Sequence, residues 1–151
     1  MAETNPGLDT LANLILDSVP LVMRTLRCEM RRNRETELSV PQFRILSFVH
    51  RRGSSSLSEI AEHMGLTLPS MSKMVDGLVM RSFVTRSNDA SDRRRLVIAL
   101  TERGTKAWES AREATRVSMV KTLATLSGDE RRELGRSMEK LRELFSTGGG
   151  K

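Results

Sequence analysis

The stretch that decides the fold lies between residues 56 and 100. It contains Ser56-Leu-Ser-Glu-Ile-Ala-Glu-His-Met-Gly65 and Thr67-Leu-Pro-Ser70, and later Phe83-Val-Thr-Arg-Ser87 and Leu96-Val-Ile-Ala-Leu100. Apolar residues in and after the first two segments recur at steps of three and four, which predicts two helices. Gly65 between them can adopt the left-handed conformation that reverses a chain within a few residues. The last two segments enclose a polar, Arg-rich loop and predict a β-hairpin.

A helix–turn–helix followed by a basic hairpin is an arrangement that holds DNA, with one helix in a groove and the hairpin tip beside it. The second helix is predicted from Leu68 to about Arg81. Its predicted inward face is apolar and consists of Leu68, Met71, Met74, Val75 and Leu78. Its outward face fits a major groove because it carries short polar groups and one lysine, namely Ser70, Ser72, Lys73, Asp76 and Gly77.

The basic residues of this region have an alternative interpretation as an ordinary solvated surface, since charge runs and single lysines are common there. Their context favours DNA contact, because Lys73 follows the turn and Arg93-Arg-Arg95 lies at the hairpin tip. An arginine at such a tip can contact phosphates or enter a narrow A·T-rich minor groove. The candidate DNA-binding residues are Thr67, Ser70, Ser72, Lys73, Arg86, Asp92, Arg93, Arg94 and Arg95.

The composition agrees with a polyanionic partner. The 151 residues carry a formal net charge of +6 and a pI of about 10.4, which favours nucleic acid first and an anionic membrane second. Hydrophobic residues make up 38% of the chain and aromatic residues 3%, so the core must be aliphatic and Met-based. A single Cys excludes an intramolecular disulfide framework. Without a secretory signal or an apolar run of ~20 residues, we expect a soluble cytoplasmic protein with no membrane partner.

Amphipathic stripes flank the central unit. Asn5-Pro6 predicts the start of a helix whose apolar residues recur from Leu8 to Met30. Thr101 is the candidate N-cap of another helix. Capping boxes predict three further helix starts and consist of Ser39 with Gln42, Ser56 with Glu59, and Ser127 with Glu130.

These elements predict a mainly α fold, a winged helix–turn–helix of three helices plus a β-hairpin wing, with dimerisation helices at both ends. The predicted division is an N-terminal dimerisation helix in residues 1–35, a winged-helix DNA-binding region in 36–100, C-terminal dimerisation helices in 101–147 and a disordered tail in 148–151. One small subunit has little left to cover the terminal apolar stripes. A two-fold homodimer in which the ends interlock is therefore expected.

Over nearly its whole length the chain resembles the MarR family of transcriptional regulators, which are winged-helix dimers. Asp92-Arg-Arg94 followed by Leu96-Val-Ile-Ala-Leu-Thr-Glu-Arg-Gly104 is similar to the family's wing signature. Ala61 and Gly65 match the small residue and the turn glycine of a helix–turn–helix. The resemblance implies that Arg94 enters the minor groove with Asp92 orienting it. It also implies that the major groove is read by Thr67, Ser70, Ser72 and Lys73.

The same resemblance implies a repressor that occupies a pseudo-palindromic operator. Many members release DNA when a small aromatic acid or phenol binds between the DNA-binding lobe and the dimerisation helices. The pocket walls predicted near that junction are Met23, Phe43, Leu46 and Trp108.

Other members of the family sense oxidants through a cysteine. Cys28 is the redox candidate, since Arg24, Arg31 and Arg32 lie one helical turn away and a positive neighbourhood makes a thiol more reactive. Its alternative is an inert helix residue. The peroxide-sensing branch pairs its cysteine with Tyr, which this chain lacks.

No residues in the sequence form a catalytic constellation. A Gly-rich phosphate loop, a nucleophile elbow and a paired-His motif are all missing, so an enzyme is not expected. His50 and His63 lack a supporting cluster of Cys or carboxylates, and we expect no metal site and no cofactor. The alternative to operator binding is a winged-helix interaction module that binds protein or RNA. A mobility shift with DNA flanking its own gene would distinguish the two.

Overall fold

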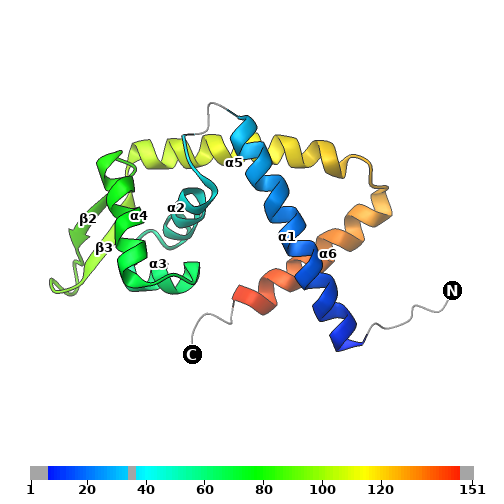
Figure 1. Cartoon of the computed structure of the whole chain (residues 1–151), viewed down its shortest axis with the longest axis horizontal. Helices are drawn as coiled ribbons and strands as arrows, with labels where there is room; N and C mark the ends of the chain where they lie inside the picture. Colours follow the sequence, from blue (N-terminus) through cyan, green and yellow to red (C-terminus); the bar gives the residue numbers. More distant parts are fainter. Residues whose placement is uncertain (1–6, 34–36, 147–151) are drawn as a thin grey trace.

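The computed structural model describes residues 7–33 and 37–146. Figure 1 shows a winged-helix unit at one end of the molecule and long helices extending from it, which confirms the predicted fold class. The predicted helix start at Asn5-Pro6 and the tail at 148–151 lie outside the described residues. In chain order the elements are α1 (Leu8–Arg32), α2 (Val40–Arg52), β1 (Ser55–Ser56), α3 (Leu57–Met64), α4 (Leu68–Met80), β2 (Val84–Asn88), β3 (Leu96–Leu100), α5 (Glu102–Leu123) and α6 (Gly128–Ser146).

Three short strands form one antiparallel sheet in the order β1-β3-β2. The predicted hairpin is present, with β2 and β3 in register from Val84 opposite Leu100 to Asn88 opposite Leu96. β1 is a strand that sequence analysis did not predict, and it pairs Ser55 with Ile98 and Ser56 with Val97. Because β1 leads directly into α3, the sheet attaches the wing to the start of the helix–turn–helix.

Side-chain caps begin α2, α3, α5 and α6 where the sequence predicted them. In the box before α2 the Gln42 N–H donates to Ser39 Oγ at 3.4 Å, and the Ser39 N–H donates to Gln42 Oε1 at 3.0 Å. The equivalent bonds are present in the boxes before α3 and α6. Gly65 ends α3 with φ 67°, in the left-handed region that lets the chain reverse toward α4.

The core lies among α2, α3, α4, the sheet and the first half of α5. Leu68 was predicted on the buried face of α4, but 49% of it is exposed because the chain from residue 65 to 70 extends beyond the core. Ile45 is fully buried although it was not assigned to the core. The large side chains that are fully buried are Ile45, Leu46, Val49, Ile60, Met71, Val75, Leu78, Phe83, Val84 and Ile98.

The start of α5 is fitted tightly against the base of the wing. Thr101 donates its N–H to the Phe83 carbonyl at 3.0 Å and its hydroxyl to the Ser82 carbonyl at 2.6 Å. Gly104 is buried one turn later, where any Cβ would overlap the same Phe83 carbonyl oxygen. The Leu-Thr-x-x-Gly segment therefore holds the strand ends of the wing on α5.

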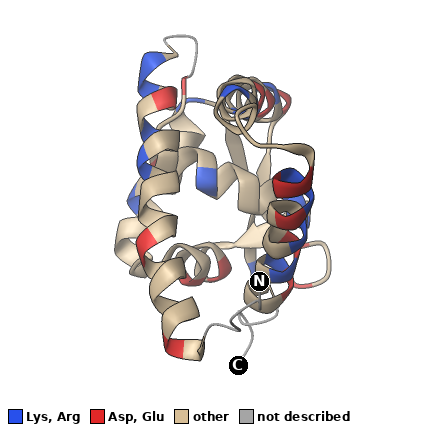
Figure 2. Ribbon diagram, turned by 90° about the vertical axis from the view of Figure 1, so that its right-hand side faces the viewer, with Lys and Arg blue, Asp and Glu red and all other residues tan. Residues whose placement is uncertain are grey.

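The long helices leave much apolar surface uncovered. α1 and α6 cross in the view of Figure 1, but Figure 2, turned by 90°, shows them on opposite sides of the molecule. No residue of α6 is buried in the described chain. None of the described helices is long and apolar enough to cross a membrane. The exposed apolar side chains of these helices are Leu8, Leu11, Leu14, Leu16, Val19, Leu21 and Val22 in α1, Val117, Val120 and Leu123 in α5, and Leu134, Met138, Leu144 and Phe145 in α6.

Candidate nucleic-acid interface

The first turn of α4 presents a small polar surface. Thr67 Oγ1 accepts the Ser70 N–H at 3.4 Å and donates to the Ser70 hydroxyl at 3.0 Å, so the two side chains are joined at the helix N-terminus. Lys73, one turn further on, is exposed, whereas Ser72 is half-buried. Four residues at the start of α4 were predicted to contact DNA. Three of them, Thr67, Ser70 and Lys73, are exposed to solvent.

The loop of the wing, residues 89–95, is shaped by its two aspartates. Asp92 accepts the Arg94 N–H on its carboxylate at 3.0 Å and the Arg95 N–H on its carbonyl at 3.0 Å. Asp89 accepts the N–H and the hydroxyl of Ser91 at 2.9 and 2.8 Å, and these bonds hold the pKa of its carboxyl below the ordinary value. Asp92 therefore acts on the backbone of Arg94 rather than on its guanidinium.

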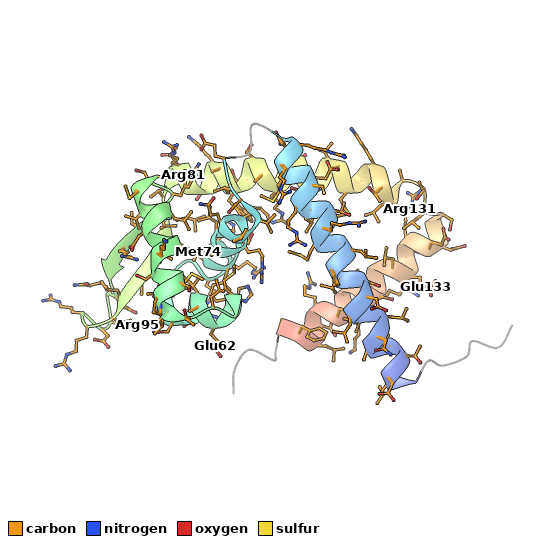
Figure 3. All side chains as sticks on the ribbon, in the orientation of Figure 1. Glu62, Met74, Arg81, Arg95, Arg131 and Glu133 are labelled. Atoms are coloured by element: carbon orange, nitrogen blue, oxygen red, sulfur yellow. The ribbon has the colours of Figure 1, made fainter. Side chains whose placement is uncertain are left out.

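The arginines of the wing fall into two groups. Arg93 and Arg94 are exposed at the tip and form no ion pair within the described residues. Arg86 instead pairs with Asp76 of α4 at 2.6 Å and donates to the Ser72 carbonyl at 3.4 Å. Arg95 pairs with Glu59 of α3 at 2.8 Å. Figure 3 shows the wing extending from the body of the molecule, with Arg95 labelled between the loop end of the wing and the helices α3 and α4.

The Glu59 side chain contacts β1, α2 and the wing loop. Its carboxylate accepts the Ser56 N–H at 2.7 Å and the Ser56 hydroxyl at 3.0 Å, and it also pairs with Arg52 of α2 at 3.2 Å and with Arg95. These partners, the Ser56 N–H foremost, lower the pKa of Glu59, so the carboxylate is charged at neutral pH. Sequence analysis found Glu59 only as a helix cap.

Two of the four residues predicted for an effector pocket are packed in the core. Leu46 is 0% and Trp108 7% exposed, and both belong to the packed core, where the Trp108 indole donates to Ser47 Oγ at 2.8 Å. Met23 and Phe43 are half-buried. A cavity of about 360 Å³ lies nearby, between the end of α1 and the start of α2, and is lined by Arg27, Met30, Arg31, Asn33, Glu37, Leu38, Ser39 and Val40.

Cys28, the redox candidate, is exposed on α1. Within the described part of the chain, no group of three or more His, Cys, Asp or Glu residues could hold a metal ion. His50 stacks on Trp108 with ring centroids 4.0 Å apart, and His63 stacks on Phe48 at 4.3 Å. Both histidines thus pack against aromatic rings.

Comparison with known proteins identifies the relatives of this chain. The MarR family model matches residues 38–96. The HTH-type transcriptional repressor Mb2911 of Mycobacterium bovis is 30% identical over 104 residues, which cover 69% of this chain and 75% of that protein. The HTH-type regulator YfiV of Bacillus subtilis is 33% identical over 95 residues, 63% of this chain and 59% of that protein.

Solved structures share the fold. The crystal structure of RV1404 from Mycobacterium tuberculosis has a TM-score of 0.79 and 24% identity, and covers 95% of this chain and 97% of its own. A mutant of MarR from E. coli, complexed with operator DNA, has a TM-score of 0.64 and 18% identity, with coverage of 90% and 99%. A MepR-like protein complexed with pseudoligands has a TM-score of 0.56 and 30% identity, with coverage of 91% and 95%. The winged-helix architecture, the family match and these relatives together establish that the chain belongs to the MarR family of transcriptional regulators.

Proposed function

We propose that the protein is a homodimeric repressor that binds a pseudo-palindromic operator, with α4 in the major groove and the wing in the minor groove. One observation supports this most directly. Arg93 and Arg94 have no intramolecular ion-pair partner in the described chain, while Arg86 binds the wing to α4. On this proposal the unpaired charges of the tip and the small polar surface of Thr67, Ser70 and Lys73 contact the same DNA. Phosphate and groove contacts need such accessible cations.

The dimer is inferred from the uncovered apolar surface. The exposed leucines of α1 and the exposed Leu134, Met138 and Phe145 of α6 have no cover in the described chain, and large exposed apolar surface is typical of protein interfaces. On this proposal residues 1–35 and 101–147 form the dimerisation part and residues 36–100 the DNA-binding part. Two recognition helices would then meet successive major grooves about 34 Å apart.

The proposal is tested with two measurements on the full chain. Light scattering at micromolar concentration should give twice the monomer mass, and Met138→Glu should shift the protein toward the monomer because it charges the exposed face of α6. A mobility shift with DNA flanking its own gene should give a discrete complex that resists non-specific competitor. A wild-type monomer, or binding that competitor DNA abolishes, would reject operator recognition and leave an interaction module.

An effector is the second part of the proposal. The MepR-like relative was solved with pseudoligands, and CouR from Rhodococcus jostii RHA1, a fold neighbour with a TM-score of 0.70, was solved with p-coumaroyl-CoA. We place a small aromatic or phenolic anion in the cavity between α1 and α2. Its lining has two arginines, Arg27 and Arg31, against one carboxylate, Glu37, and its apolar walls are Met30, Leu38 and Val40. Ligand there would contact the dimerisation helix and the DNA-binding part together.

The effector site is tested by thermal shift with salicylate-like and phenolic compounds, followed by operator titration with each hit. A compound that stabilises the protein should weaken operator binding, and Arg27→Gln should reduce both effects. Stabilisation that leaves operator affinity unchanged would reject the regulatory role, since a ligand shifts an equilibrium only by its preference for one state.

A further inference from the structure

We propose that Glu59 is a positioning residue, which holds the wing against α3 through Arg95 and thereby sets the affinity for DNA without touching DNA. The inference rests on the proposed function, in which the wing tip contacts DNA. Glu59 then has a role beyond capping α3. The arginines of the wing fall into those that contact DNA and those that attach the wing to the helix–turn–helix.

The backbone attachment of the wing ends before its loop. β1 pairs with β3 only at Ser55 opposite Ile98 and at Ser56 opposite Val97. Arg95 lies two residues beyond Val97, toward the tip, where β1 offers no further hydrogen bond. The ion pair between Arg95 and Glu59 at 2.8 Å extends the attachment past the last backbone pair.

Both ends of this ion pair are themselves held in place. The Glu59 carboxylate is fixed by the N–H and hydroxyl of Ser56 and by Arg52. Arg95 closes the loop, because its N–H donates to the Asp92 carbonyl and its carbonyl accepts the Asp89 N–H at 2.8 Å. Holding the Arg95 guanidinium in place therefore restricts the backbone that carries Arg93 and Arg94.

The other strand of the wing has an equivalent attachment. Arg86 of β2 binds Asp76 and the Ser72 carbonyl of α4, as Arg95 beside β3 binds Glu59 of α3. Each helix of the helix–turn–helix is thus connected to one side of the wing by an arginine. Arg86 and Arg95 are among the DNA contacts predicted from the sequence, and on this proposal they position the wing instead.

Arg95 could either bind phosphate itself or position the wing. Removing the negative charge of Glu59 distinguishes these roles, because it changes the affinity for DNA in opposite directions. If Arg95 binds phosphate itself, the loss of a competing carboxylate frees Arg95 and tightens DNA binding. If Arg95 positions the wing, the same loss weakens DNA binding. Glu62 provides the matched control, since it lies on the same helix and points outward in Figure 3, and its side chain has no hydrogen-bond or ion-pair partner within the described residues.

The experiment compares Glu59→Gln with Glu62→Gln in the full-length protein. Gln at this position keeps the capping box, because either Glu or Gln can accept the N-cap N–H. The probe is a duplex that the wild-type protein selects from a random-sequence library, and affinity is measured by fluorescence anisotropy. We expect Glu59→Gln to weaken binding about threefold or more, a coupling of the size seen within one ion-pair network. Glu62→Gln should bind as tightly as wild type or more tightly.

A double-mutant cycle supplies the second readout. Arg95→Gln should weaken binding in the wild-type background and have little further effect in the Glu59→Gln background. Should Glu59→Gln fail to fold, hydrogen exchange of the free Arg95→Gln protein replaces the cycle. The amides of residues 84–100 should then exchange faster than in wild type, because the attachment is lost without DNA present.

The outcomes separate this inference from the proposed function. If the wild-type protein selects no duplex, the proposed function fails. If wild type binds and Glu59→Gln binds at least as tightly as Glu62→Gln, the positioning role is overturned while operator binding stands. Additive effects of Glu59→Gln and Arg95→Gln, or unchanged exchange in the wing of Arg95→Gln, would overturn it as well.

Discussion

Arg94→Gln is the sharpest test of the wing as a DNA contact. The Arg94 side chain is exposed and has no ion pair within the described chain, while its backbone N–H is held by Asp92. The substitution therefore removes a charge from the tip and leaves the loop geometry intact. We expect the folded protein to be as stable as wild type and its affinity for DNA to fall.

The size of the effect follows from the number of charges removed. Each phosphate neutralised by a protein contributes about −0.9 to the slope of log K against log salt concentration. One arginine per subunit in a dimer makes two contacts, so the slope should become less steep by about 1.8. Salt from about 50 to about 200 mM spans a fourfold range. Over that range the ratio of wild-type to Arg94→Gln affinity for DNA should fall by a factor of about 12, or about 1.5 kcal/mol.

The assay is fluorescence anisotropy with the selected duplex at four salt concentrations in that range. Arg136→Gln is the matched control, because Arg136 is exposed on α6 and the substitution removes the same charge from the same dimer. Its slope should equal that of wild type. An Arg94→Gln slope that also equals wild type, with unchanged affinity, would show that the wing tip makes no phosphate contact and would refute the reasoning.

Two further predictions concern stability. Gly104→Ala should destabilise the fold by about 3 kcal/mol in denaturant unfolding, because the new Cβ overlaps the Phe83 carbonyl and the backbone must move. Gly77→Ala, with no atom within 4 Å of the new Cβ, should instead stabilise α4 by about 1 kcal/mol, and equal effects would contradict the packing argument. Partial desolvation of the His63 ring, with Arg51 and Arg44 nearby, lowers the pKa of His63 below 6.5. The unfolded chain therefore binds the proton first, so wild type should lose stability as pH falls below 6.5, whereas His63→Gln should not show this loss.

The helix starts and the hairpin could be predicted because their signals are local. A capping box needs residues only three positions apart, and all three predicted boxes are present. The β2–β3 hairpin likewise joins segments separated by one short loop. The apolar stripes of the terminal helices were also visible, since amphipathic periodicity is a property of a single helix.

β1 could not be predicted, because the residues that make it a strand, its pairing partners in β3, lie about 40 positions later in the chain. Ser55 and Ser56 have no strand-like pattern of their own and become a strand only by pairing with Ile98 and Val97. The exposure of Leu68 was missed for a related reason. Periodicity assigns a residue to a face of its helix, but it does not tell where along the helix the neighbouring elements end.

The same limit explains why the arginines of the wing look alike in sequence. Arg93, Arg94 and Arg95 are consecutive, and no local rule separates the one that meets α3 from the two that remain exposed. The separation depends on the β1–β3 register, which brings the start of α3 beside the wing and leaves Glu59 within 2.8 Å of Arg95. The two-residue strand β1 thus decides which arginine of this run is paired within the described chain. Inserting one residue between β1 and α3 would move Glu59 out of register with Arg95, and we expect it to weaken DNA binding in the anisotropy assay, as we expect of Glu59→Gln.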